Sequence, residues 1–185
     1  MDPRPWNVTS SLFPGPIVEP NPSPKARPST PFRAAVTHII FADPNNRRIA
    51  VGAWGVKSYE VDEAADALDA GFDRVHGATY EELTDDRSPL TLEQIQQRLA
   101  SAETLAAAVS ALIEEFGDDF DTWDEVARLA FAGVVVRHAE LGVLADASWR
   151  VLAIDWLEHE DIDWDEATAR RLRRQKEVAL LNRAP

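Results

Sequence analysis

Residues 122–142, TWDEVARLAFAGVVVRHAELG, decide the fold. Thr122 and Glu125 have the spacing of a capping box, which predicts that a helix begins here. Apolar side chains then recur at steps of three and four residues until Gly142, and they cover a broad part of the helix surface. They are Trp123, Val126, Ala127, Ala130, Phe131, Val134, Val135 and Leu141. This segment is therefore expected to be the central helix of a helical core.

Helical periodicity continues on both sides of this segment. Gly77 and Gly117 are each predicted to end a helix, because glycine readily adopts the backbone conformation found just after a helix. Thr91, Asp146 and Asp163 are expected to cap the starts of three others. Together these signals predict an all-α fold, either an antiparallel helical bundle or stacked helical hairpins.

The last predicted helix is polar over most of its surface, because it contains Arg170-Arg-Leu-Arg-Arg-Gln-Lys176. Its basic side chains are expected to pair with carboxylates of the body, while the surplus carboxylates stay at the surface. Only a few of its side chains are expected to pack. They are Trp164, Ala167, Leu172, Ala179 and Leu180.

The N-terminal part has a different composition. Nine of the twelve prolines lie within residues 1–34, which are also rich in Ser and Asn, and this predicts a disordered tail. Residues 35–55 contain two apolar runs around Asp43-Pro-Asn-Asn46, a pattern that predicts a small β-hairpin, with an irregular extension as the alternative. Residues 56–185 are expected to form an acidic helical domain.

The motif Gly52-Ala-Trp-Gly55 is followed by Tyr59, Glu60 and a segment rich in Asp and Ala. Over residues 52–66 this opening resembles a family of small bacterial proteins, a domain of unknown function. Members of that family often begin at the motif, and the resemblance implies no activity. It agrees with the hypothesis that a valine-type start codon at Val51 begins the native chain.

The formal net charge of −13 is unevenly distributed, since residues 51–169 contain 28 acidic and seven basic side chains. Such a surface repels phosphates and anionic lipids, so direct nucleic-acid binding and membrane binding are not expected. A basic protein partner is the natural complement. Cysteine is absent, and neither a signal peptide nor a membrane-spanning stretch is recognisable. We therefore expect a cytoplasmic protein.

No familiar catalytic or nucleotide-binding motif is present, and no cofactor is expected. Asp161-Ile-Asp-Trp-Asp165 begins like a calcium loop, but Glu166 and Leu172 stand where that loop requires Gly and Glu. No metal is assigned to it. The four histidines include no pair at helical metal-ligand spacing, so a metal site would have to combine His76 or His138 with Glu from other helices.

Two functions remain. The first is a non-enzymatic bacterial interaction protein, of the immunity, inhibitor or nucleic-acid-mimic type, whose acidic helical surface binds a basic partner. The expected contact residues are Trp54, which precedes the first helix, and Asp118, Asp119 and Asp121. The alternative is a metal-dependent hydrolase with His and Glu ligands on facing helices. No catalytic residue is assigned, and the oligomeric state is left open.

Overall fold

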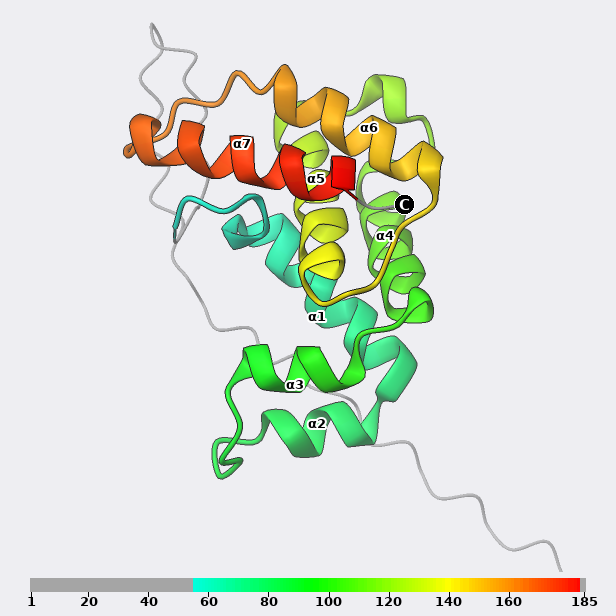
Figure 1. Ribbon diagram of the computed structural model, residues 1–185. Coiled ribbons are helices and arrows are strands. Elements are labelled where there is room, and N and C mark those ends of the chain that lie inside the picture. The colour runs from blue at the N-terminus through cyan, green and yellow to red at the C-terminus, as the bar shows by residue number, and fades with distance from the viewer. Residues whose placement is uncertain (1–54, 184–185) are drawn as a thin grey trace, which may run out of the picture. The chain divides into compact units, whose positions relative to one another are not determined.

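The computed structural model describes residues 55–183. This part of the chain forms seven α-helices and two short 3-10 helices and contains no strand, which confirms the all-α prediction. The elements are η1 (Ser58–Glu60), α1 (Asp62–His76), α2 (Ala78–Thr84), α3 (Leu92–Leu99), α4 (Ala102–Phe116), η2 (Phe120–Thr122), α5 (Glu125–Glu140), α6 (Ala147–Glu158) and α7 (Ala167–Arg183) (Figure 1). The predicted tail and residues 35–54 of the predicted hairpin lie outside the described residues.

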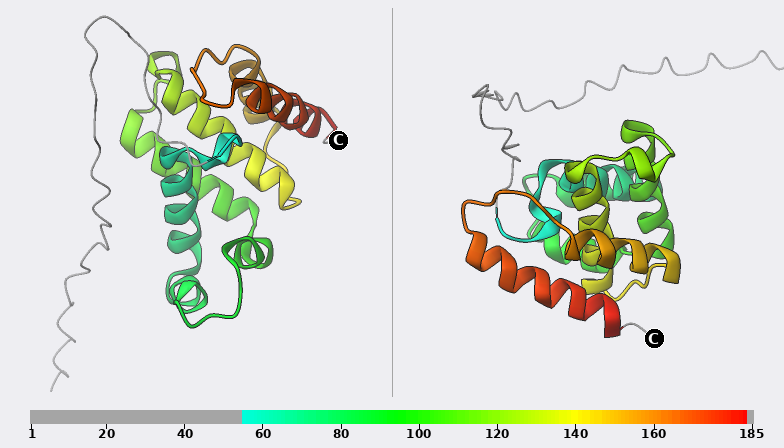
Figure 2. Two further views of the ribbon diagram at one scale, coloured as in Figure 1. Left: turned by 90° about the vertical axis from the view of Figure 1, so that its left-hand side faces the viewer. Right: turned by 90° about the horizontal axis from the view of Figure 1, so that it is seen from above.

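Helix α5 is the central helix, as predicted. Residues 131–138 are all buried, and η1, α1, α4, α6 and α7 pack against α5 (Figures 1 and 2). Aromatic rings fill the space beside its first half: the ring of Phe131 lies 5.2 Å from that of Trp156 and 6.3 Å from that of Trp123, in edge-to-face geometry. The expected core position of Trp123 is confirmed, and Trp156 is partly buried against the core.

The start of α5 differs from the prediction. Asp124, not Thr122, is the N-cap, and its Oδ1 accepts a hydrogen bond of 2.9 Å from the backbone N–H of Ala127. Thr122 instead closes η2 and donates its hydroxyl to the carbonyl of Asp119. The carboxylate of Asp124 is a strong capping group, and it competes successfully with the hydroxyl two residues earlier.

The predicted helix ends at Gly77, Gly117 and Thr91 are confirmed, and Asp146 stands at the N-cap position of α6 without a side-chain capping hydrogen bond. The predicted cap at Asp163 is wrong, because α7 begins only at Ala167 and its first backbone hydrogen bond runs from the N–H of Arg170 to the carbonyl of Glu166. Gly77 and Gly117 follow α1 and α4 at φ values of 48° and 94°. The Thr91 hydroxyl caps α3 by accepting from the N–H of Gln94. Helices α1 and α4 approach closely where Gly71 faces Ala108, because a Cβ at position 71 would lie 2.7 Å from the Ala108 backbone nitrogen. The small residues thus allow the two backbones to touch.

The helices form stacked pairs around α5. The hairpin of α2 and α3 lies at one end of the described part, and the pair of α6 and α7 lies at the other (Figures 1 and 2). No helix within residues 55–183 is both long enough and apolar enough to cross a membrane.

Helix α7 packs in a way that the sequence analysis did not predict. Leu172 is 54% exposed, and Ala167 and Ala179 are exposed as well, so the expected apolar contacts of these three are wrong. The buried face instead contains Arg170 and Glu177. These polar side chains can face the core because they form hydrogen bonds and ion pairs with one another.

These buried charges form a network. The Nε of Arg170 donates to Glu160 at 3.0 Å, and its Nη1 donates to Glu177 at 2.8 Å. Arg173 donates to both Glu177 and Glu140. The expected pairing of the basic segment with the protein's own carboxylates is therefore confirmed for Arg170 and Arg173. The expectation that the carboxylates all stay at the surface is wrong for Glu160 and Glu177, whose side chains are 4% and 0% exposed.

Candidate acidic interaction site

One face of α1 consists of aspartates. Asp62, Asp66, Asp69 and Asp73 follow one another at steps of four, three and four residues, so they share one side of the helix. We call this face the acidic stripe. The last three are exposed, whereas another face of α1, which includes Phe72, is buried in the core. The helical period that buries the apolar face thus also gathers the aspartates.

The carboxylates of the acidic stripe repel one another. Burial, together with the charges of Asp62 and Asp69, raises the pKa of Asp66 above its ordinary value. Burial also raises the pKa of the adjacent Glu63. A backbone hydrogen bond lowers this pKa, but nearby carboxylates, including Glu115, raise it again, so that it stays above its ordinary value. Within residues 55–183, the three exposed aspartates of the stripe form no ion pair. The described part of the protein leaves their negative charge without a paired cation.

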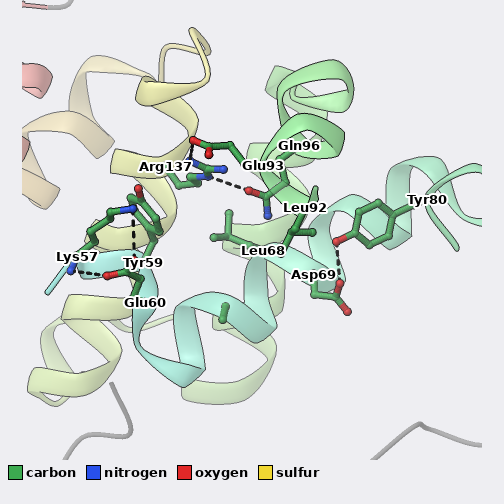
Figure 3. A pocket seen from close by; sticks show the side chains of 11 residues that line it. Lys57, Tyr59, Glu60, Leu68, Asp69, Tyr80, Leu92, Glu93, Gln96 and Arg137 are labelled. Carbon is green, nitrogen blue, oxygen red and sulfur yellow. Dashed lines mark hydrogen bonds and ion pairs between the residues drawn. The ribbon is translucent and has the colours of Figure 1, made fainter. Parts of the chain in front are cut away.

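A cleft of about 340 Å³ opens beside the acidic stripe (Figure 3). Residues of η1, α1, α2, α3 and α5 line it, and Asp69 belongs to both the cleft and the stripe. Leu68 and Leu92 lie in its middle. The full lining is Lys57, Tyr59, Glu60, Ala65, Leu68, Asp69, Tyr80, Leu92, Glu93, Gln96 and Arg137. The cleft therefore combines an apolar centre with charged groups around it.

A glycine of α5 positions one wall of the cleft. A Cβ at Gly133 would lie 2.5 Å from the carbonyl oxygen of Ser58 and 2.9 Å from the Cα of Tyr59, so only glycine lets η1 lie directly on α5. The backbone N–H of Ser58 also donates to the buried Glu177 carboxylate at 3.1 Å. These two contacts fix η1, and η1 in turn places Tyr59 beside the cleft.

Two cations line the cleft, and both are already engaged. Lys57 lies 3.3 Å from the Glu60 carboxylate. The side chain of Arg137 is only 7% exposed, its Nε donates to Gln96 at 2.8 Å, and its Nη1 lies 3.7 Å from Glu93. Neither cation forms an ion pair with Asp69. The cleft thus remains acidic at the edge that it shares with the stripe.

Tyr80 joins α2 to this edge. Its hydroxyl donates to Asp69 at 2.8 Å, and its ring stacks on that of Phe72 with 5.7 Å between the centroids. Burial raises the pKa of Tyr80, and the hydrogen bond to Asp69 and the charge of that carboxylate raise it further. The phenol therefore remains protonated at neutral pH, so it orients Asp69 without neutralising it.

The residues predicted as partner contacts lie elsewhere. Asp118, Asp119 and Asp121 are exposed together in the connection between α4 and α5, and Asp119 accepts a hydrogen bond from the N–H of Asp121 at 3.2 Å. None of the three lines the cleft. Trp54 lies outside the described residues. The role of these four residues in partner binding stays a prediction.

The histidines proposed for a metal site serve other contacts. His138 is fully buried, its Nε2 lies 3.1 Å from the Thr104 hydroxyl, and its Nδ1 lies 3.0 Å from the Val134 carbonyl. Burial lowers its pKa to about 4. The Nε2 of His76 lies 2.9 Å from the carbonyl of Leu99. No group of three or more His, Cys, Asp or Glu side chains within residues 55–183 is arranged to hold a metal ion.

The acidic stripe is not among the predicted sites, although the four-three-four spacing of its aspartates is visible in the sequence. The sequence contains no local signal for the cleft, because η1, α3 and α5 meet there only in the folded chain. Comparison with protein-family models, with curated proteins and with solved structures gives no match.

Proposed function

We propose that this protein is a non-enzymatic interaction protein that binds a basic protein partner through the acidic stripe of α1. The observation that supports this most is that Asp66, Asp69 and Asp73 form no ion pair with any of residues 55–183. Like charges three or four residues apart each cost a helix about 0.2–0.5 kcal/mol. A partner that places Lys or Arg side chains opposite the stripe removes this repulsion. The relief of the repulsion therefore contributes favourably to the free energy of binding.

The same charge selects the class of partner. Nucleic acids and anionic membranes carry negative charge and are repelled by the stripe, whereas a basic protein is attracted to it before contact. Asp118, Asp119 and Asp121 form a second exposed acidic group, which we retain as a predicted contact region. The experiment therefore has to separate the stripe from this region and from bulk charge.

Three double variants change the net charge equally at different places. Asp66→Lys with Asp73→Lys reverses the stripe and leaves the hydrogen bond between Tyr80 and Asp69 intact. Asp118→Lys with Asp121→Lys reverses the second region. Asp161→Lys with Asp165→Lys alters two exposed aspartates before α7 and is the matched control.

The full-length protein is immobilised, and bound proteins are captured from a bacterial extract, identified, purified and titrated against each variant. We expect a basic partner whose affinity falls as salt increases and drops about tenfold or more on reversal of the stripe, with little change in the control. Equal losses in all three variants would show that only bulk charge matters. Failure to retain any basic protein would also contradict the proposal.

A further inference from the structure

We infer that the cleft beside the acidic stripe is an anchoring pocket for an amphipathic basic helix of the partner, and that the helix inserts an apolar side chain against Leu92 and Leu68. This inference rests on the proposed function and adds where, and by what chemistry, the partner is held. Binding an amphipathic helix in a groove is a common mode of recognition, with apolar anchors at helical spacing.

The apolar part of the argument begins with Leu92. It is 55% exposed at the first position of α3, and it points into the cleft beside Leu68 (Figure 3). Single exposed leucines are common on protein surfaces, and Leu172 is exposed to the same extent. Leu92 differs because it lies in a concave site with a second leucine and two tyrosine rings. Because Leu68 and Tyr80 are only 3% and 4% exposed, an inserted side chain would contact mainly Leu92.

The size of the cleft fits such an anchor. Its volume of about 340 Å³ is near the lower end of the range for ligand pockets, roughly 300–1,000 Å³. A space of this size suits one or two large side chains. The two cations that line the cleft are engaged by carboxylates of the protein itself.

Charge complementarity indicates which side chains the partner helix has outside the cleft. Glu60, Asp69 and Glu93 surround the cleft from three different elements, and Asp66 and Asp73 continue the negative charge along α1. Glu60 and Glu93 face Lys57 and Arg137, whereas Asp69 has no basic partner within residues 55–183. The matching ligand therefore has an apolar side chain for the cleft and Lys or Arg side chains along the stripe. A second copy of this acidic chain is a poor match, because it is repelled.

Two synthetic helical peptides of equal length and charge provide the probe. One contains lysine and leucine, with the leucines on a single face, and the other contains lysine and alanine. Their affinities for the full chain are measured by fluorescence anisotropy at low and moderate salt. Leu92→Ser removes the proposed contact, and Leu172→Ser is the matched control because the two leucines are 55% and 54% exposed.

We expect the lysine/leucine peptide to bind more tightly than the lysine/alanine peptide. Leu92→Ser should weaken the lysine/leucine peptide by about tenfold, the loss expected when one leucine contact is removed, and leave the lysine/alanine peptide unchanged. Leu172→Ser should change neither affinity. Equal effects of the two substitutions, or no effect of Leu92→Ser, would overturn the inference.

The outcomes separate this inference from the proposed function. If both peptides bind with salt dependence and respond to reversal of the stripe but not to Leu92→Ser, the acidic stripe remains as the binding site and the anchoring pocket is wrong. If neither peptide binds at low salt, both proposals fail. Concentration-dependent self-association in sedimentation experiments that Leu92→Ser abolishes would assign the cleft to a second copy and overturn the inference.

Discussion

Replacing Arg170 with Met is expected to lower the free energy of unfolding by about 3–5 kcal/mol, the usual cost of removing one partner from a buried ion pair. The Arg170 side chain is 3% exposed, and it contacts Glu160 and Glu177, which are 4% and 0% exposed. Without Arg170 these two carboxylates lose their main counter-charge. The carbonyl of Val56, which accepts a hydrogen bond of 3.0 Å from Arg170, also loses its donor.

The assay is urea-induced unfolding at neutral pH, followed by circular dichroism. Arg171→Met is the matched control, because Arg171 is the exposed neighbour on the same helix, and its effect should stay within about 0.5 kcal/mol. Adding Glu177→Gln to Arg170→Met should recover part of the loss, since one buried charge is then removed. A loss below about 1 kcal/mol, or a loss equal to that of the control, would refute the account of how α7 is held.

Three further predictions test other parts of the structure. Asp66→Asn should raise the free energy of unfolding by about 0.5 kcal/mol at neutral pH, because the raised pKa of Asp66 shows that its charged form is disfavoured in the fold. Near pH 3, where the carboxyl is protonated in both states, the substitution should leave the free energy of unfolding unchanged. Chemical denaturation at the two pH values measures this, and a destabilising effect at neutral pH would contradict it. Burial lowers the pKa of His138 to about 4, so the unfolded chain takes up this proton first and the stability contributed by the neutral ring is lost as pH falls from about 6.5 to about 4. The corresponding part of the acid destabilisation, at most roughly 3 kcal/mol, should be missing from a pH series of His138→Phe, and an unchanged slope would argue against the buried neutral ring. Gly133→Val should cost about 1–3 kcal/mol in thermal or urea unfolding and detach η1 from α5, and a variant as stable as the wild type would show that the backbone of η1 does not lie on α5.

The overall fold could be predicted because its signals are local. The broad apolar face of residues 126–141, the stop at Gly117 and the cap at Thr91 are each read from a few neighbouring residues, and the structure confirms them. The start of α5 was misplaced because Thr122 and Asp124 both offer capping oxygens. Local pattern alone does not decide which of two such neighbours caps the helix.

The packing of α7 and the cleft could not be predicted in the same way. Arg170 and Glu177 look like solvent-facing residues on a polar helix, and their burial depends on Glu160 and on the backbone of Val56, more than 100 residues from α7. The acidic stripe could be predicted in part. Its spacing is present in the sequence, but only the structure shows that Asp69 of the stripe also lines a cleft.

Binding at the acidic stripe is tested most directly by heteronuclear NMR titration of the full chain with the lysine/leucine peptide. The account predicts that the amide signals of residues 62–73 in α1 and 92–96 in α3 shift most, and that these shifts shrink as salt increases. Shifts centred on residues 118–121, or spread evenly over the acidic surface, would contradict it.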